Sequence, residues 1–130
     1  MTARKSLPKP TESELEILAV LWKTGPATVR HVHDQLNINR DMGYTTVLKL
    51  LQIMHEKGLV TRDETERTHV YSAAESREKT QQRIVGDLLT RAFEGSASSL
   101  VMRALSTQKA SATELEEIRA ILDQMEGKRK

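Results

Sequence analysis

The chain has 130 residues, with 20 lysines and arginines against 18 aspartates and glutamates, so its formal net charge is only +2. This length suits one domain, or a small domain with an appendage, and so weak a charge does not by itself indicate a nucleic-acid partner. The chain has no cysteine, which excludes disulfides and thiolate metal sites and fits a reducing cytoplasm. It contains neither an apolar run long enough to span a membrane nor an apolar segment typical of a signal peptide, so we expect a soluble cytoplasmic protein.

The chain begins with a basic, proline-containing stretch, residues 1–10, that we expect to be a flexible arm. Thr11 and Glu14 then have the spacing of a capping box, in which the side chain of each residue accepts a hydrogen bond from the backbone amide of the other. We therefore predict a first helix from Thr11 to about Lys23, ended by Gly25 and Pro26. Its apolar residues recur at helical spacing: Leu15, Ile17, Leu18, Leu21 and Trp22.

Two further helices are predicted before residue 60. Thr28 can cap a short second helix that buries Val29, Val32 and Leu36, and the turn-like segment 37–41 follows it. A third helix is expected from about Gly43 to Lys57, with Gly58 as its left-handed stop. Its buried face should carry four apolar residues: Val47, Leu50, Leu51 and Met54.

Residues 59–63 and 68–73 have the β-branched and aromatic content of two short strands, which predicts a β-hairpin. Three helices followed by a hairpin are the element order of a winged helix-turn-helix domain, in which the third helix enters the major groove of DNA. We therefore predict a mainly α protein with a small hairpin (α+β), whose winged-helix domain spans residues 11–74.

Residues 75–126 are predicted to form a helical dimerisation domain, with a basic tail at 127–130. These helices are short and carry one aromatic residue, so the segment is marginal alone and needs a partner for its apolar stripes. A second copy of the chain is the favoured partner, and folding back onto the N-terminal half is the alternative. The predicted dimerisation residues are Ile84, Leu88, Leu89, Phe93, Leu100, Val101, Leu105, Leu115, Ile118 and Leu122.

Polar residues at the start of the third helix are the candidate DNA contacts. Short hydroxyls and a cation suit phosphates at a helix N-terminus, and lysine and glutamine side chains can reach guanine and adenine edges. An ordinary solvated face is the alternative for this helix taken alone. The start of the second helix and Arg67 of the hairpin are expected to hold phosphates, whereas Asp63, Glu64 and Glu66 are repelled by them. The full predicted set is Thr28, Arg30, Tyr44, Thr45, Thr46, Lys49, Gln52 and Arg67.

Other kinds of site are not favoured by the residue pattern. His31 and His33 lie two apart and do not share a helix face, and no carboxylate cluster completes a ligand set, so we expect neither a metal nor a cofactor. The sequence has no phosphate-binding glycine loop, nucleophile elbow or paired catalytic carboxylates. We therefore expect that the protein is not an enzyme and has no small-molecule substrate.

Three segments of the sequence resemble the penicillinase-repressor family, the BlaI/MecI/CopY type of bacterial winged-helix repressor. They are "TESELEILAVLWKTGPATVRHVHDQL", "YTTVLKLLQIMHEKGLV" and "ATELEEIRAILD", and the resemblance covers roughly residues 9–126. It implies a homodimer that binds a palindromic operator in double-stranded DNA and represses β-lactam resistance or stress genes. Ile53 stands where many relatives carry an arginine that faces DNA.

The resemblance also bears on how such a repressor is released. The absence of cysteine rules out the metal sensing of the copper-responsive branch. The antibiotic-responsive branch is inactivated when a membrane sensor-protease cleaves the dimerisation segment, and the corresponding bond here falls near Arg103 and Ala104. Two alternatives remain open at this point: a winged-helix regulator that responds to a small molecule, and a winged-helix module that binds protein without DNA.

Overall fold

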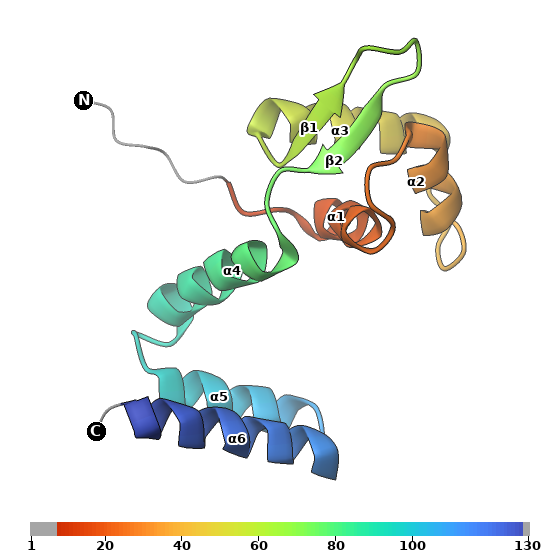
Figure 1. Ribbon diagram of the computed structural model, residues 1–130. Coiled ribbons are helices and arrows are strands. Elements are labelled where there is room, and N and C mark those ends of the chain that lie inside the picture. The colour runs from red at the N-terminus through yellow and green to blue at the C-terminus, as the bar shows by residue number, and fades with distance from the viewer. Residues whose placement is uncertain (1–7, 129–130) are drawn as a thin grey trace, which may run out of the picture. The chain divides into compact units, whose positions relative to one another are not determined.

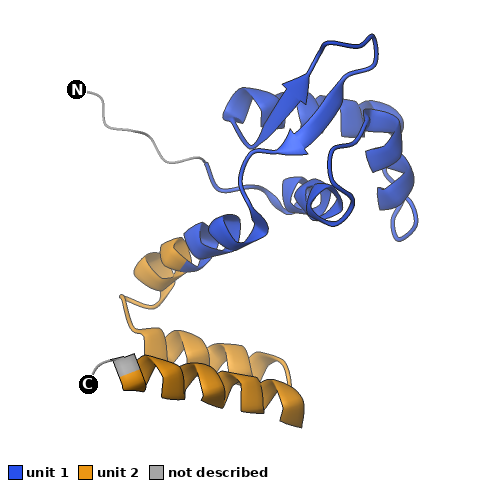
Figure 2. Ribbon diagram, in the orientation of Figure 1, with its two compact units in different colours: residues 1–85 blue, residues 86–130 orange. Residues whose placement is uncertain are grey.

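The computed structural model describes residues 8–128 and confirms a mostly helical protein with one two-stranded antiparallel hairpin (Figure 1). The chain forms two compact units: the N-terminal unit ends at Val85 and the C-terminal unit begins at Gly86 (Figure 2). The division lies inside helix α4 (Arg77–Ala92), later in the chain than the boundary expected after Ala74. Most of the predicted arm, and the last two residues of the predicted tail, lie outside the described residues.

Helix α1 (Glu12–Thr24) has the predicted capping box. The Thr11 amide donates to the Glu14 carboxylate at 2.9 Å, and the Glu14 amide donates to the Thr11 hydroxyl at 3.2 Å. The helix ends where Gly25 takes a φ of 86°, a backbone conformation that residues with a Cβ rarely adopt. Local chemistry therefore fixes both ends of this helix.

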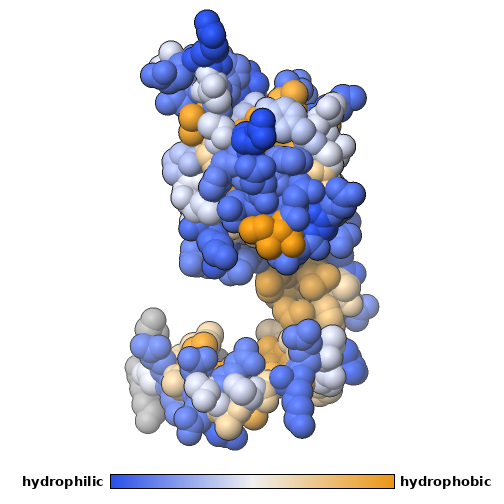
Figure 3. All heavy atoms as spheres, turned by 90° about the vertical axis from the view of Figure 1, so that its right-hand side faces the viewer, coloured by the Kyte–Doolittle hydropathy of each residue, from blue (hydrophilic) through white to orange (hydrophobic). Residues whose placement is uncertain are grey.

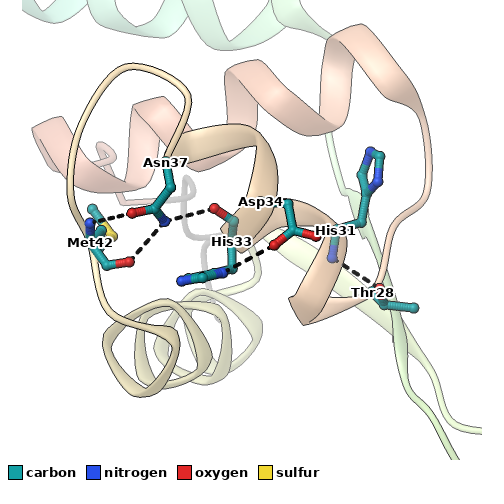
Figure 4. Close-up of polar contacts among 6 residues, drawn as sticks. All are labelled: Thr28, His31, His33, Asp34, Asn37 and Met42. Atoms are coloured by element: carbon teal, nitrogen blue, oxygen red, sulfur yellow. Dashed lines mark hydrogen bonds and ion pairs between the residues drawn. The ribbon is translucent and has the colours of Figure 1, made fainter.

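Helices α2 (Val29–Leu36) and α3 (Tyr44–Lys57) form the helix-turn-helix, and the turn between them is held by one side chain. The Asn37 amide nitrogen donates to the carbonyls of His33 and Met42, and its oxygen accepts the Met42 amide (Figure 4). Gly58, with φ 87° and ψ 10°, ends α3 in the left-handed conformation that its sequence predicts.

Strands β1 (Val60–Asp63) and β2 (Val70–Ala73) pair in antiparallel register, with Arg62 opposite Tyr71. Both are shorter than predicted. Leu59 is not in β1 because its amide donates to the Met54 carbonyl at 2.9 Å and so closes the end of α3. Tyr71 also pairs with Ala27, before α2, through two backbone hydrogen bonds of 2.9 and 2.8 Å. This bridge ties the hairpin to the helix-turn-helix.

Among the residues whose burial is described (8–127), every buried hydrophobic residue lies in the N-terminal unit, where α1, α2, α3 and the hairpin enclose one core. The predicted apolar faces of α1, α2 and α3 supply most of it, although Leu15, Trp22 and Leu50 are only partly buried. The fourteen core residues are Ile17, Leu18, Leu21, Ala27, Val29, Val32, Leu36, Met42, Val47, Leu51, Met54, Leu59, Val60 and Tyr71.

An ion pair between a buried carboxylate and a partly exposed ammonium joins the first turn of α1 to the last turn of α3. The Glu14 side chain is 2% exposed, and one of its oxygens accepts a 2.8 Å hydrogen bond from the Lys57 ammonium. Burial raises the pKa of the Glu14 carboxyl, but the hydrogen bonds from Lys57 and Thr11 outweigh burial and set it below the ordinary value. The pair therefore stabilises the ionised carboxylate inside the fold.

The first turns of α4 pack on α1, which explains why the N-terminal unit extends to Val85. The Trp22 indole donates to the Glu75 carbonyl at 3.0 Å, and the Arg77 guanidinium lies 5.7 Å from the centre of the Trp22 ring. Thr80 is 2% exposed, and Arg83 forms a 2.8 Å ion pair with Glu75. These contacts join residues far apart in the chain, so local sequence patterns do not show that the first turns of α4 belong with the N-terminal unit.

The C-terminal unit contains the end of α4, helix α5 (Ala97–Thr107) and helix α6 (Ala112–Lys128). A tight turn at Glu94 and Gly95, with φ of 51° and 81°, separates α4 from α5. The Ser96 hydroxyl caps α5, and the Ser111 hydroxyl accepts the Glu114 amide at 3.1 Å, as the second predicted capping motif requires. No described residue of this unit is buried.

Candidate nucleic-acid interface

Helix α3 presents one apolar and one polar side. Val47, Leu51 and Met54 are fully buried, which turns Thr45, Lys49 and Gln52 outward; Thr46 is also exposed, on the flank of the same face. Within residues 8–128 the Lys49 ammonium forms no hydrogen bond or ion pair, so its charge is available to a ligand. The predicted recognition residues of α3 therefore share one exposed side of the helix.

Ile53, four residues after Lys49, lies on the same exposed side of α3 and has 42% of its surface exposed. An apolar side chain here offers no hydrogen bond, in contrast to a base-reading arginine or glutamine. It can make apolar contacts only, such as those with a thymine methyl group. Glu56 is also exposed one turn further on, so the polar and cationic groups are concentrated in the first half of the helix.

Tyr44, the first residue of α3, is held by two residues of α2. The Arg30 guanidinium lies 6.0 Å from the centre of its ring, and the His33 ring meets it edge-on at 5.7 Å. The His33 imidazole in turn contacts the Asp34 carboxylate at 3.3 Å (Figure 4). Tyr44 remains 45% exposed, so its position is fixed while part of its surface faces solvent.

The N-terminal ends of α2 and α3 differ in how their backbone amides are satisfied. At α2 the Thr28 hydroxyl accepts the His31 amide at 3.2 Å, as predicted for a cap (Figure 4). At α3 the preceding residue is Gly43, which has no side chain to cap the first turn. Its free amides and the helix dipole favour an anion beside Tyr44 and Thr45.

A hollow of about 320 Å³ lies where α2, α3 and the hairpin meet. Its lining includes five of the eight predicted contact residues, from all three elements: Thr28, Arg30, Tyr44, Gln52 and Arg67. Thr45, Thr46 and Lys49 do not line it and lie on the exposed surface of α3. The hollow therefore brings together residues that are nearly 40 positions apart in the sequence.

The hairpin adds four residues to the hollow that the predicted contact set did not include: Arg62, Thr68, His69 and Tyr71. The Arg62 guanidinium donates to the Glu64 carboxylate at 2.6 Å. Asp63 instead accepts the amide and hydroxyl of Thr65, which lowers the pKa of its carboxyl and shapes the turn. The alternation of arginines and acids was visible in the sequence, but which pair forms depends on the turn.

Residues 8–128 contain no group of three or more histidine, cysteine, aspartate or glutamate side chains that could hold a metal ion. Every helix in the same range is too short or too polar to cross a membrane.

The predicted dimerisation residues are exposed or half-buried, and in the space-filling view apolar groups appear over α4 and along α5 and α6 (Figure 3). A hollow of about 550 Å³ is lined by apolar residues of all three helices, among them Leu88, Phe93, Leu100 and Ile118. Val101 and Leu122 are 48% and 55% exposed. Arg103 and Ala104, the predicted cleavage position, are exposed residues within α5.

Three helices, a two-stranded hairpin and an exposed polar face on the third helix define a winged helix-turn-helix protein. The solution structure of the DNA-binding domain of the repressor BlaI has this fold: it aligns with a TM-score of 0.50 and 23% identity over 57% of this chain and 90% of that domain.

The chain belongs to the penicillinase repressor family, whose profile it matches over residues 10–124. It is 32% identical to the transcriptional regulator BlaI of Mycobacterium tuberculosis over 114 residues, 87% of this chain and 82% of that protein. It is 23% identical to the penicillinase repressor of Bacillus licheniformis over 126 residues, 97% of this chain and 98% of that protein. The family consists of transcriptional regulators and not of enzymes.

Proposed function

We propose that the protein is a DNA-binding transcriptional repressor that acts in the bacterial cytoplasm as a homodimer on a palindromic operator. The observation that carries the proposal is the geometry of α3: its apolar side closes the core, while Thr45, Thr46 and Lys49 point outward beside a hollow lined by Arg30 and Arg67. A major groove admits such a helix, and cations beside it match the phosphates of the two flanking strands.

The proposed contacts fall into two groups. Lys49 and Gln52 read base edges, and the methyl groups of Thr45 and Thr46 touch thymine methyls. Four residues hold phosphates and so fix the register of the protein on the duplex: Thr28, Arg30, Tyr44 and Arg67. These phosphate contacts carry no sequence information. A module that binds protein without DNA would need an apolar exposed face on α3, whereas most of the residues exposed there are polar.

The proposed dimer rests on the exposed apolar residues of the C-terminal unit. A second copy is the economical partner, because a two-fold dimer covers the same stripes on both chains with one interface. Two winged helices joined in this way would read two half-sites about 34 Å apart, one turn of the DNA helix. A two-fold dimer would read a palindromic operator, and the relationship to penicillinase repressors supports repression of resistance or stress genes.

Release of the operator is proposed to follow cleavage by a membrane sensor-protease between Arg103 and Ala104. These residues are exposed, and cutting between them would separate the first half of α5 from α6 and divide the dimerisation segment. Incubation of the chain with the protease domain of a cognate sensor should give two fragments that separate at this bond. A chain that stays intact would remove this part of the proposal.

The function is tested by fluorescence anisotropy with duplex DNA from the region upstream of the protein's own gene, measured over a series of salt concentrations. Lys49→Ala should weaken operator binding by about 1–3 kcal/mol if Lys49 reads a base edge. Arg67→Ala should weaken all duplexes alike and reduce the salt slope by about 0.9 if it holds one phosphate. Lys23→Ala, which removes an exposed lysine of α1, is the matched control.

Two results would contradict the proposal. One is the absence of salt-dependent binding to any duplex by the unmodified chain. The other is that Lys49→Ala binds the operator as tightly as the Lys23→Ala control does. That result would rule out α3 as the recognition helix.

A further inference from the structure

Arg62 lies at the mouth of the interface but differs from the other arginines there. It lines the same hollow as Arg30 and Arg67, and its side chain is 23% exposed. Its guanidinium donates to the Glu64 carboxylate at 2.6 Å, a short charge-assisted hydrogen bond. In contrast, Arg67 forms no hydrogen bond or ion pair with the described residues 8–128.

The hairpin itself holds Arg62 and Glu64 in this arrangement. Arg62 stands opposite Tyr71 in the strand register, and Tyr71 is 1% exposed. Hydrogen bonds with Tyr71 and then with Glu64 raise the pKa of the Arg62 guanidinium. The bond from Arg62 in turn lowers the pKa of the Glu64 carboxyl, so both groups keep their charge as a pair. Arg62 is thus placed by the strand register opposite the buried Tyr71, and its guanidinium donates to Glu64.

We propose that Glu64 masks Arg62 from the DNA backbone, so that this carboxylate lowers the protein's affinity for every duplex, whatever its sequence. The inference rests on the proposed function, since it needs DNA at this hollow. A guanidinium that already donates to a carboxylate is neutralised, and a phosphate that approaches it meets the negative charge of Glu64 first. Arg30 and Arg67 hold phosphates, while Arg62 is kept out of that contact.

The masking is weak enough to adjust the affinity without abolishing it. The Glu64 side chain is 50% exposed, and exposed ion pairs of this kind contribute little to stability because water and salt screen them. Removing the carboxylate should therefore tighten binding by up to about five-fold. The gain should be equal on operator and scrambled DNA, because a phosphate contact reads no bases.

The test is a double-mutant cycle with Glu64→Gln and Arg62→Gln, measured by anisotropy on operator and on scrambled duplex over a series of salt concentrations. Glu64→Gln should tighten binding to both duplexes and steepen the log–log salt slope by about 0.9, the value for one additional phosphate contact. Arg62→Gln alone should change affinity by less than about two-fold, because a masked arginine contributes little. In the Glu64→Gln background, Arg62→Gln should remove the whole gain.

Glu66→Gln is the matched control, since Glu66 is an exposed carboxylate of the same turn and is not bonded to Arg62. Its effect should be the same with and without Arg62. Fluorescence of Trp22, the only tryptophan, verifies that each variant keeps the fold of the N-terminal unit.

The masking is contradicted if the gain from Glu64→Gln persists in the Arg62→Gln background, or if Glu64→Gln binds no more tightly than the unmodified chain. These outcomes leave the proposed function intact, since both require duplex binding. Absence of binding by the unmodified chain and by all of the variants would overturn the proposed function and the masking together.

Discussion

The two units of the protein differ in whether their apolar residues are buried. The N-terminal unit buries fourteen hydrophobic residues in one core, while no described residue from Gly86 onward is buried. Leu51 is 0% exposed and Leu122 is 55% exposed, although each lies on the apolar side of its own helix. An amphipathic stripe therefore predicts burial but not the partner: the first stripe is covered within its own unit, and the second is left exposed within its own unit, where we propose that a second copy of the chain covers it.

If a second copy covers the C-terminal unit, a charge in its stripe should affect DNA binding without touching the DNA-binding unit. Leu122→Asp should dissociate the dimer and weaken operator binding by about 10²–10⁴-fold, the usual advantage of linking two binding modules. Sedimentation velocity and anisotropy measure the two effects. Gln124→Asp, which adds the same charge to an exposed polar position of α6, is the control and should leave both unchanged.

Whether the core of the N-terminal unit is independent of the C-terminal unit can be tested by truncating one leucine in each unit. Leu51→Ala should lower the free energy of unfolding of the N-terminal unit by about 2–5 kcal/mol, because it leaves a cavity in a packed interior. Urea unfolding followed by Trp22 fluorescence measures it. Leu122→Ala should leave that transition unchanged, and an equal loss in both variants would mean that the two units share one core.

The ion pair between the buried Glu14 and Lys57 adds to this contrast, because the described part of the C-terminal unit has no buried carboxylate. Lys57→Ala should lower the free energy of unfolding at pH 7 by about 2 kcal/mol, since it removes the charged partner of a buried carboxylate. Glu14 has a lowered pKa in the folded state. Its stabilisation is therefore present above the ordinary value of 4.5 and is lost as the pH falls through the lower, folded value.

The measurement is urea unfolding at several pH values between 7 and 3. The unmodified chain should lose stability on acidification, and Glu14→Gln should lose less over the same range, because it lacks the titrating group. Equal acid sensitivity of the two proteins would show that Glu14 does not carry this pH dependence.

The sequence was sufficient for features set by neighbouring residues. The Thr11 capping box, the Thr28 cap and the Gly58 stop depend on spacings of a few residues, and the structure has all three. The order of three helices and a hairpin followed from the same local patterns. The Lys49 face of α3 was predictable because helical periodicity fixes which side chains oppose a buried stripe.

Contacts between distant residues could not be predicted in the same way. The Ala27–Tyr71 bridge and the Trp22 bond to Glu75 join segments that only the complete fold brings together. The hollow that gathers Thr28, Gln52 and Arg67 has the same origin, so its shape was not readable from spacing. The choice of Glu64 as the partner of Arg62 depends on turn geometry that composition does not specify.

In the proposed assembly, two copies of the chain are joined through their C-terminal units and place two α3 helices on one operator. Native mass spectrometry of the chain with a duplex that carries an inverted repeat from its own upstream region tests this most directly. We expect a complex of two chains per duplex that forms without a stable one-to-one species and is lost in Leu122→Asp. A complex of one chain per duplex, or a two-chain complex that survives Leu122→Asp unchanged, would contradict it.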